Sequence, residues 1–374
     1  MKEWFMNLWK KQIIRYIAVA LASAVAFGLG GFFIGKSVKN NLSVDNVANN
    51  SSGGAGDSGL LNGENNQKYS SEGVMYEVSG DGTYAEVVGY TGNGGAVTIE
   101  ETYNNLPVKH IRQNAFYMLD SMTSILIPDS VTSIDMCAFY CCSGLTEIIL
   151  PNGITSIGMQ AFSTCANLKY NEYNNINYLG NEENPYLAAA SVVSKDLTFF
   201  EIHNDTKFLL YELFLRCFKL TEVVIPDGVI SIGCRAFHKC HSLKQLILPD
   251  SVVIIDAEAF EDCTIAEIII PSSVTSIGIK AFSRCIHLEK VVLSDGVESI
   301  GRGAFYGCES LTEIIIPNSV TSIGGYAFYD CSSLTSLMFR GTVEEWNAIK
   351  KGEHWNIGIP VTEIVCIGGS VSVQ

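Results

Sequence analysis

The chain has 374 residues, 47% of them hydrophobic and only 17% charged, so folding must bury a large apolar interior to prevent aggregation. Its formal net charge is −15, although the first 40 residues alone carry +5 and the remainder therefore −20. An acidic chain without a basic stripe repels phosphate groups, which excludes nucleic acid as the expected partner.

The N-terminus predicts a membrane anchor. Residues 16–35 (YIAVALASAVAFGLGGFFIG) contain no charged side chain, and a helix of this length spans about 30 Å of hydrocarbon. Four cations lie within residues 1–15 and two follow the apolar stretch. The positive-inside rule then places residues 1–15 in the cytoplasm, so we expect a single-pass protein of the cell membrane whose main part is extracellular.

A secretory signal peptide is the competing interpretation, with Ala22-Ser23-Ala24 as its cleavage site. Cleavage there would leave a short apolar core before the site and a strongly apolar new N-terminus after it, so we favour the anchor. A cleaved chain would be secreted. Both interpretations predict export of the rest of the protein.

Two segments precede the main body. Residues 36–71 are rich in Asn, Ser, Gly and Asp and predict a flexible linker, which as a Gly-rich coil would span about 30 Å on average. From Gly73 the pattern alternates, and VMYEV and TYAEVVGY flank Ser-Gly-Asp-Gly, which is typical of a β-hairpin. We expect residues 72–107 to form an N-terminal β cap over the first repeat.

An internal repeat is the strongest signal in the sequence. A phenylalanine, usually preceded by alanine, recurs at intervals of 23 residues, with one interval of 22 and one of 52. The interval of 52 exceeds one period by 29 residues and predicts an insertion at about residues 169–195. Periods of this size are typical of solenoids. The recurring residues are Phe116, Phe139, Phe162, Phe214, Phe237, Phe260, Phe282, Phe305 and Phe328.

Each unit resembles residues 311–331, LTEIIIPNSVTSIGGYAFYDC. We expect the first, fourth and sixth residues of LTEIII to point inward, because side chains alternate along a strand and the unit must supply a core. Pro317 cannot donate to a strand ladder and should end the strand. Val320 and Ile323 should line the opposite wall, with the Ala-Phe pair between. Nine such units stacked at about 4.8 Å would share one core.

These units closely resemble the BspA-type leucine-rich repeat, whose pattern LxxIxIPxxVTxIGxxAFxxC is matched at Leu145–Cys165 and Leu311–Cys331. The resemblance covers residues 108–342 and rests on a Pro, an Ala-Phe pair and a Cys at fixed offsets. It implies a mainly β solenoid, a right-handed leucine-rich-repeat superhelix of short strands with turns and short helices, preceded here by one transmembrane helix. It also implies a surface protein that binds other macromolecules, in some members host or matrix proteins.

Some segments depart from the pattern. Leu119 stands in place of Cys, Ser294 in place of Pro, and Leu213-Phe214 in place of Ala-Phe. The insertion, which is similar to a module found in this family, should form two strands around GNEENP. It is either a binding projection or a tolerated loop. Residues 343–374 resemble the family's C-terminal cap, with a helix that carries Val343, Trp346 and Ile349 on one face, stopped by Gly352, and a last strand over 361–366.

Twelve cysteines in an exported chain would ordinarily suggest disulfides, but the spacing of these cysteines argues against them. Eight of the twelve cysteines lie three residues after a repeat phenylalanine and should form an inward row of free thiols. His238, Cys240 and His241 offer three metal-ligand types in four residues, but Cys240 belongs to that row and its neighbours should face elsewhere. We therefore expect no metal and no cofactor. The row comprises Cys142, Cys165, Cys217, Cys240, Cys263, Cys285, Cys308 and Cys331.

No nucleophile elbow, phosphate-binding loop, HExxH or dinucleotide motif is present, so we expect no enzymatic activity. The candidate site is instead the outward face of the first strand in each unit. Its third positions interleave charges and its fifth positions are mostly apolar, either for partner binding or because β-branched residues suit strands. The predicted partner-binding residues are Glu147, Ile149, Glu222, Val224, Gln245, Ile247, Glu267, Ile269, Lys290, Val292, Glu313 and Ile315.

The sequence therefore predicts a membrane-anchored binding or adhesion protein whose partner is an extracellular protein or a glycan, such as a host, matrix or envelope component. Two other functions stay open at this point. One is an envelope-bound hydrolase that uses carboxylates of the insertion, and the other is a structural spacer.

Overall fold

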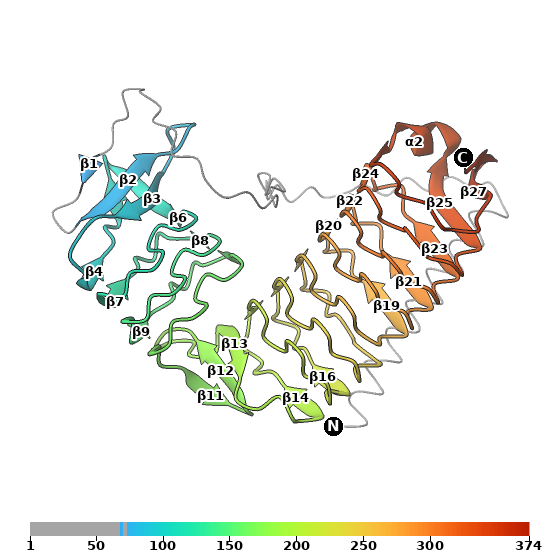
Figure 1. The fold of residues 1–374 in the computed structure, drawn as a ribbon. Helices are drawn as coiled ribbons and strands as arrows, with labels where there is room; N and C mark the ends of the chain where they lie inside the picture. Colours follow the sequence, from blue (N-terminus) through green and yellow to red (C-terminus); the bar gives the residue numbers. More distant parts are fainter. Residues whose placement is uncertain (1–67, 70–72, 374) are drawn as a thin grey trace.

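The computed structural model describes residues 68–69 and 73–373. The predicted cytoplasmic segment, the membrane anchor and most of the linker lie outside the described residues. Among the helices of the described part, none combines the length and apolarity that crossing a membrane requires. The described chain forms the predicted solenoid, in which successive coils stack side by side along a bent axis (Figure 1).

Two parallel ladders run along the solenoid, because each coil contributes a first strand from its LTEIII-like segment and a second strand from its Ser-Ile segment. Partners in adjacent coils are offset by one repeat, as for Glu267, Lys290 and Glu313. The first ladder contains β4 (Gly95–Thr98), β7 (Met122–Leu126), β9 (Glu147–Ile148), β14 (Phe199–Glu201), β16 (Glu222–Val224), β19 (Glu267–Ile270), β21 (Lys290–Leu293), β23 (Glu313–Ile316), β25 (Ser336–Thr342) and β27 (Glu363–Ile367). It begins at β4, within the residues expected to form the cap.

The second ladder faces the inside of the bend, and the first ladder its outside (Figure 1). This is clear on the C-terminal arm, where β20, β22 and β24 lie along the inner edge and β19, β21 and β23 farther out. The second ladder contains β6 (Leu106–Ile111), β8 (Ser133–Ile134), β10 (Ser156–Ile157), β15 (Phe208–Leu209), β17 (Ser231–Ile232), β18 (Ile254–Ile255), β20 (Ser276–Ile277), β22 (Ser299–Ile300), β24 (Ser322–Ile323) and β26 (Lys350–Lys351).

The core consists of apolar columns made by equivalent residues. The repeat phenylalanines stack ring on ring, with centroids 4.9–5.6 Å apart wherever two of them are neighbours. Leu311, Ile314 and Ile316 of the representative unit are fully buried, as are its Ala327 and Phe328. The predicted inward positions are therefore confirmed. Burial is shared between coils, so a single coil would expose most of this surface.

A third set of hydrogen bonds joins the coils at the segment around each Ala-Phe pair, which we call the Ala-Phe turn (residues 114–118 in the first coil). The amide nitrogens of Asn114, Phe116 and Met118 donate to the carbonyls of Met136, Ala138 and Tyr140 in the next coil, over 3.2, 2.8 and 2.8 Å. The turn's first and last residues adopt left-handed backbone in every repeat. Consequently its amides at alternate positions all point toward the next coil and its carbonyls back toward the preceding one.

The insertion forms three strands, one more than predicted: β11 (Asn171–Tyr173), β12 (Ile176–Leu179) and β13 (Ala188–Val192). The predicted turn at GNEENP joins β12 to β13, which pair in antiparallel fashion. β13 pairs in parallel with β15 and so occupies the place of a second strand. β10 is the last strand of its sheet, so the second ladder is interrupted between β10 and the insertion.

Caps close both ends. The predicted N-terminal hairpin consists of β2 (Val74–Val78) and β3 (Ala85–Tyr90), and β1 (Lys68–Tyr69) and β5 (Thr102–Tyr103) pair beside it. At the other end α2 (Val343–Ala348) begins with a capping box between Thr342 and Glu345 and buries Trp346. The helix ends four residues before Gly352, the predicted stop. β27 supplies the predicted last strand, and β28 (Gly369–Ser372) adds another.

Candidate functional site

The third positions of the first ladder face outward, as predicted. Glu267, Lys290, Glu313 and Ser336 pair in register from β19 to β25. Lys290 and Glu267 form an ion pair at 3.8 Å, with half or more of each side chain exposed. Exposed pairs of this kind stabilise a fold by about 0–1 kcal/mol, so these charges are available to a partner at little cost to the fold. Glu147 and Gln245 are also exposed, and Glu222 is half-buried.

The side chains at the fifth positions are less exposed than the side chains of a fully exposed apolar stripe would be. Ile149 is 41% exposed, whereas Val224, Ile269, Val292 and Ile315 are half-buried between their neighbours. Ile247 is only 9% exposed and belongs to the core surface. The predicted residues therefore lie on the outer side of the first ladder, which is divided into three sheets (β4 to β9, β14 to β16, and β19 onward). Apolar exposure on this side is greatest on the N-terminal arm, where Leu126 reaches 55%.

The cysteine row lies in the core, as expected, and seven of its eight thiols donate to a backbone carbonyl. Cys240 Sγ donates to the carbonyl of Phe214 at 3.2 Å and Cys263 Sγ to that of Phe237 at 2.9 Å, one coil back in each case. All twelve cysteines are free. Burial raises the pKa of the Cys331 thiol to about 12. A thiol whose pKa is raised in this way, such as that of Cys331, is uncharged at neutral pH and acts as a core donor, which leaves it unreactive.

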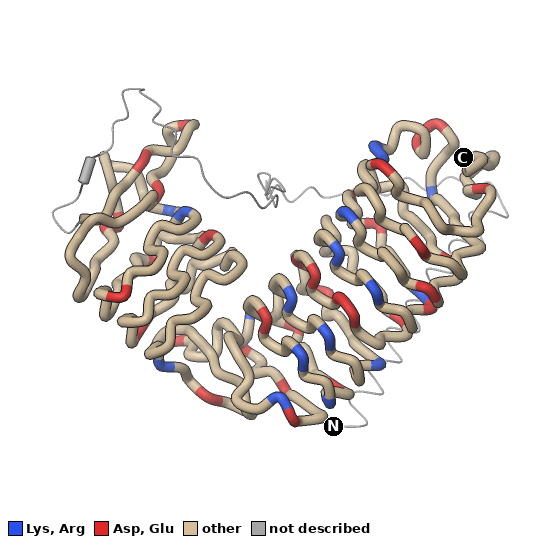
Figure 2. Tube along the Cα trace, in the orientation of Figure 1, with Lys and Arg blue, Asp and Glu red and all other residues tan. Residues whose placement is uncertain are grey.

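The inner edge of the C-terminal arm carries alternating charges (Figure 2). They arise where the Ala-Phe turns of successive coils place Glu212, Arg235 and Glu258 side by side. Arg235 Nε lies 2.6 Å from Glu258 Oε2, and its Nη1 lies 3.6 Å from Glu212 Oε1. Hydrogen bonding to Glu258 raises the pKa of Arg235, which keeps the guanidinium charged. The row is therefore held by its own ion pairs.

His238, Cys240 and His241 do not converge on one point. Cys240 points into the core, while His241 Nε2 lies 3.4 Å from Asp262. His238 instead approaches Glu258 and Glu261, with one potential ligand atom from each residue within 4.8 Å of the others. Arg235 already binds Glu258, and His238 Nδ1 lies 3.3 Å from Glu261. A metal ion would have to displace these partners, so ion pairing explains the cluster better.

A cleft of about 350 Å³ lies at the junction between the N-terminal arm and the C-terminal arm, and we call it the junction cleft. The Ala-Phe turn of residues 160–164 lines one side, and Leu210, Tyr211 and Glu212 of the next Ala-Phe turn line the other. Tyr140, Tyr170 and Ser191 complete its walls. Sequence reasoning missed this cleft, although the 52-residue interval and the Leu213-Phe214 departure both mark its position.

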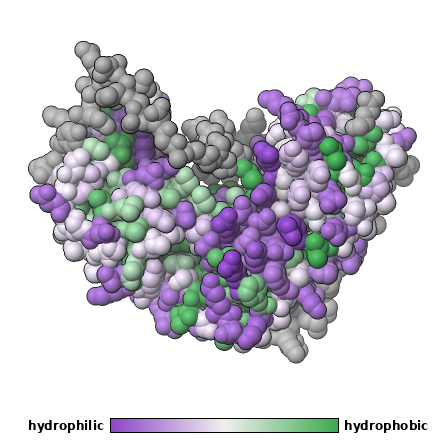
Figure 3. Space-filling model, in the orientation of Figure 1, coloured by the Kyte–Doolittle hydropathy of each residue, from purple (hydrophilic) through white to green (hydrophobic). Residues whose placement is uncertain are grey.

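The two arms differ in surface character (Figure 3). Hydrophilic side chains gather over the middle of the molecule and on the adjoining C-terminal arm, whereas the N-terminal arm is paler and more apolar in this view. The carboxylates of the insertion, which the hydrolase interpretation requires, are exposed: Glu172, Glu182 and Glu183. Among the residues that line the junction cleft, Glu212 alone carries a carboxylate.

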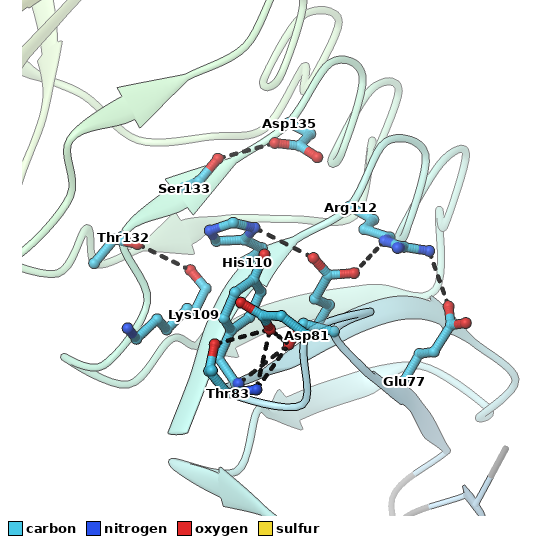
Figure 4. Close-up of polar contacts among 12 residues, drawn as sticks. Glu77, Asp81, Thr83, Lys109, His110, Arg112, Thr132, Ser133 and Asp135 are labelled. Atoms are coloured by element: carbon cyan, nitrogen blue, oxygen red, sulfur yellow. Dashed lines mark hydrogen bonds and ion pairs between the residues drawn. The ribbon is translucent and has the colours of Figure 1, made fainter. Parts of the chain in front are cut away.

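The N-terminal cap contains a second polar cluster (Figure 4). Arg112 Nε pairs with Glu86, whose side chain is 8% exposed, and Arg112 Nη1 lies 2.9 Å from Glu77. His110 Nδ1 approaches Glu86 at 3.4 Å. In the adjoining hairpin, hydrogen bonds from Ser79 and Thr83 lower the pKa of Asp81. Because these residues join the hairpin to β6, the cluster is structural.

The chain was compared with solved structures and with curated proteins. One similar solved structure is a leucine-rich cell surface protein of Faecalibacterium prausnitzii A2-165, with 24% identity over 79% of this chain and 99% of that chain and a TM-score of 0.32. Another is a leucine-rich repeat protein of Bacteroides ovatus ATCC 8483, with 22% identity over 78% of this chain and 92% of that chain and a TM-score of 0.33. A third is the pneumococcal vaccine antigen PcpA, with 16% identity over 79% of this chain and 98% of that chain and a TM-score of 0.41. A search of curated proteins found no significant match.

The family model described as the BspA type leucine rich repeat region matches residues 98–184 and 207–335 in six copies. These ranges include more than half of the chain and leave out the end of the insertion and the residues up to β15. The matched residues include all nine repeat phenylalanines and most strands of both ladders. The chain therefore belongs to the BspA-type leucine-rich repeat family.

Proposed function

We propose that this chain is a non-enzymatic surface protein that binds an extracellular macromolecule, a protein or a glycan, through the outer face of its first ladder. The observation that carries the proposal is the in-register alignment of outward side chains along β19, β21, β23 and β25. Hydrogen bonding on both sides holds each inner strand of this ladder in place. A partner would therefore meet a preformed surface and lose little affinity to ordering it.

Charge and apolar contact have separate roles on this face. Glu267 and Glu313 flank Lys290, so the face favours a partner with complementary charges. Ile269, Val292 and Ile315 form the adjacent apolar row, which would supply the desolvated centre of the interface. The acidic ectodomain adds long-range repulsion of acidic partners and attraction of basic ones.

The proposal includes anchoring by residues 16–35, with the repeats outside the cell. Their uncharged, helix-length sequence and the cations of residues 1–15 support this orientation. Protease treatment of intact cells should remove the repeats and leave an N-terminal tag of the full chain protected. Protection of the repeats as well would contradict the orientation, and an N-terminus at residue 25 in the mature protein would contradict the anchor.

The binding face can be tested by a triple substitution, Ile149→Glu, Ile269→Glu and Ile315→Glu, in the full chain purified with a mild detergent. Binding to a panel of extracellular-matrix proteins and surface glycans would be measured by surface plasmon resonance. We expect the variant to lose about tenfold or more in affinity for any partner that the unchanged protein binds, because three carboxylates would be desolvated at the contact.

A matched control carries the same three changes at exposed isoleucines outside this face: Ile254→Glu, Ile286→Glu and Ile357→Glu. The control should keep its affinity, and circular dichroism should show both variants folded. Equal binding by the folded test variant and the unchanged protein would reject the outer face as the site. Failure of the unchanged protein to bind any member of the panel would count against a role as a broad adhesin.

A further inference from the structure

The junction cleft exists because one coil lacks its Ala-Phe turn. β13 stands beside β15 as a second strand, yet the chain returns from Ala189 to Phe199 in ten residues, where Ile232 to the equivalent Gln245 takes thirteen. Residues 193–198 therefore pass directly to the first ladder. Phe200 packs edge-on against Phe214, with centroids 5.0 Å apart, and closes the aromatic column there.

The missing turn leaves one wall of the cleft with unpaired donors. In every other repeat the turn's three amides donate to the following coil or cap, as Glu212, Phe214 and Arg216 do to Cys234, Ala236 and His238. The amides of Gln160, Phe162 and Thr164 have no acceptor among the residues that the structure describes. Gln160 and Thr164 have φ of 58° and 60°. The left-handed residues at the two ends of the turn direct its alternate amides to one side, so this wall of the cleft presents a row of unpaired donors to an anionic group.

The opposite wall of the cleft has unpaired hydrogen-bond acceptors. The carbonyls of Tyr211, Leu213 and Leu215 are equivalent to those that accept from a preceding turn elsewhere, and within the described chain nothing donates to them. The Glu212 carboxylate lines the same wall and is 30% exposed. One wall of the cleft is thus electropositive through its amides, and the other is electronegative through carbonyls and a carboxylate.

Aromatic side chains form the rest of the site. Tyr140, Phe162, Tyr170 and Tyr211 line the cleft. Burial raises the pKa of both Tyr170 and Tyr211 to about 12, so their hydroxyls stay uncharged and able to donate at physiological pH. A volume of about 350 Å³ falls at the lower end of the range of about 300–1,000 Å³ found for small-molecule pockets. The space suits a ligand of a few residues and not a folded domain.

We propose that the junction cleft binds a small zwitterion, an amino acid or a short peptide with free termini. Its carboxylate accepts from amides in the row formed by Gln160, Phe162 and Thr164, and its ammonium group donates to Glu212 and the carbonyls beside it. The aromatic walls contact the side chains. Backbone capture of a terminal carboxylate is an established mode of peptide recognition. The unpaired amides of one wall match the carboxylate of such a ligand, and the unpaired carbonyls and the carboxylate of the other wall match its ammonium group. The site is independent of the outer face.

The test uses the full chain in mild detergent and isothermal titration with four probes: alanine, trialanine, trialanine amide and N-acetyl-trialanine. Trialanine should bind, and both blocked peptides should bind about tenfold or more weakly, because each loses one charged end. Alanine and trialanine then distinguish a free amino acid from a peptide as the preferred ligand. Equal binding of the amide, or no heat from any probe at millimolar concentration, would overturn the proposal.

Two variants locate the site. Ala190→Trp should abolish binding by filling the cleft, whereas Ala166→Trp, at an exposed position outside the cleft-lining residues, should leave it unchanged. Glu212→Gln should weaken the binding of trialanine and leave that of N-acetyl-trialanine unaffected. Glu309→Gln, at an exposed site outside the cleft, is the control. Unchanged binding by folded Ala190→Trp protein, or equal loss for both peptides with Glu212→Gln, would contradict the assignment.

Discussion

Each repeat cysteine combines the volume of a small apolar side chain with one hydrogen-bond donor. Its sulfur lies in the column of buried side chains, and it donates to the phenylalanine carbonyl of the preceding coil in most units, for example from Cys308 to Phe282 at 3.2 Å. Alanine would fill less space and leave that carbonyl with one donor fewer. Thus a residue often associated with disulfides works here as a neutral link between neighbouring coils.

Stability should fall in alkaline solution because these thiols titrate late in the folded protein. Burial raises the pKa of Cys331 from 9.0 to about 12 and that of Cys217 to about 11. The unfolded chain then loses protons first, so the contribution to stability is complete below about pH 9 and is lost between pH 9 and 12. Chemical denaturation under reducing conditions should show this decline.

Cys331→Ser should reduce the slope of that decline by up to about 1.4 kcal/mol per pH unit, because serine does not titrate there. The serine hydroxyl can still donate to the carbonyl of Phe305, which accepts from Cys331 at 3.1 Å. Indistinguishable slopes for the variant and the unchanged protein would show that this thiol has no shifted pKa.

The phenylalanine column predicts a difference between interior and junction positions. Phe237 is fully buried between Phe214 and Phe260, so Phe237→Ala should destabilise its arm by about 3–5 kcal/mol through the cavity it leaves. Phe162 has only one stacked neighbour among the repeat phenylalanines, Phe139, and its other side borders the junction cleft. Phe162→Ala should cost less, about 2–3 kcal/mol, because solvent can enter the space. Urea denaturation compares the two, and equal losses would contradict this.

At the scale of single elements, the N-terminal cap depends on an ion pair that is buried on one side. Arg112→Met would remove the arginine from the largely buried Glu86 and leave His110 Nδ1 as a close polar contact. We expect a loss of about 2–3 kcal/mol, below the 3–5 kcal/mol typical of fully buried pairs because Arg112 is 46% exposed. Thermal unfolding gives the measurement.

Combining Arg112→Met with Glu86→Gln serves as the control for that prediction, since it removes the uncompensated charge. The double variant should recover part of the stability. A double variant no more stable than Arg112→Met alone would mean that packing by the arginine stem, and not charge, holds the hairpin in place.

The repeat elements were predictable from sequence because their constraint is periodic. Inward positions such as Ile314 follow from strand alternation, and the third and fifth positions do lie in register on the outer face. Ile247 shows the limit, because its place in the row suggests the same exposure as Ile269. Its segment instead forms an isolated bridge, from Gln245 to Glu267, in place of a regular strand, and Ile247 is buried. The sequence pattern predicts whether a side chain points inward or outward, whereas the exposed fraction of that side chain depends on the local backbone.

The insertion was only partly predictable for a related reason. Its turn at GNEENP has a clear composition signal, but residues 169–195 contain no period that assigns β13 to the second ladder. The missing Ala-Phe turn, and with it the junction cleft, follows from that pairing. Leu213, which replaces alanine there, is 1% exposed at the first turn after the gap, where no preceding turn restricts its size.

At the scale of the whole molecule, the solenoid contains two cores. One buried cluster extends from Val74 to Leu210 and the other from Ile176 to Cys366, and they meet at the insertion. The second ladder and the Ala-Phe turn bonds are both interrupted there. In a solenoid stability is transmitted between neighbouring coils, so the two arms should be weakly coupled.

Denaturation should therefore occur in two transitions. Phe139→Ala should lower the midpoint of one transition and Phe282→Ala that of the other, because each residue belongs to a different core. Both tryptophans of the described residues, Trp346 and Trp355, lie in the C-terminal arm, so the change in tryptophan fluorescence on unfolding reports that arm. Far-ultraviolet circular dichroism reports both arms. A single transition that both substitutions shift equally would show that the junction is fully cooperative.

The Ala-Phe turns also give the stack a direction. Within each arm, every internal turn donates from its amides to the following coil and accepts at its carbonyls from the preceding one. The final set of amides, at Tyr326, Phe328 and Asp330, donates to the carbonyls of Glu353, Trp355 and Ile357. Deleting one 23-residue repeat from the C-terminal arm would bring together two coils whose hydrogen-bonding edges are already complementary. The number of repeats can therefore change while the two caps stay the same. Gain or loss of 23-residue blocks is thus an available route to longer or shorter proteins with the same caps.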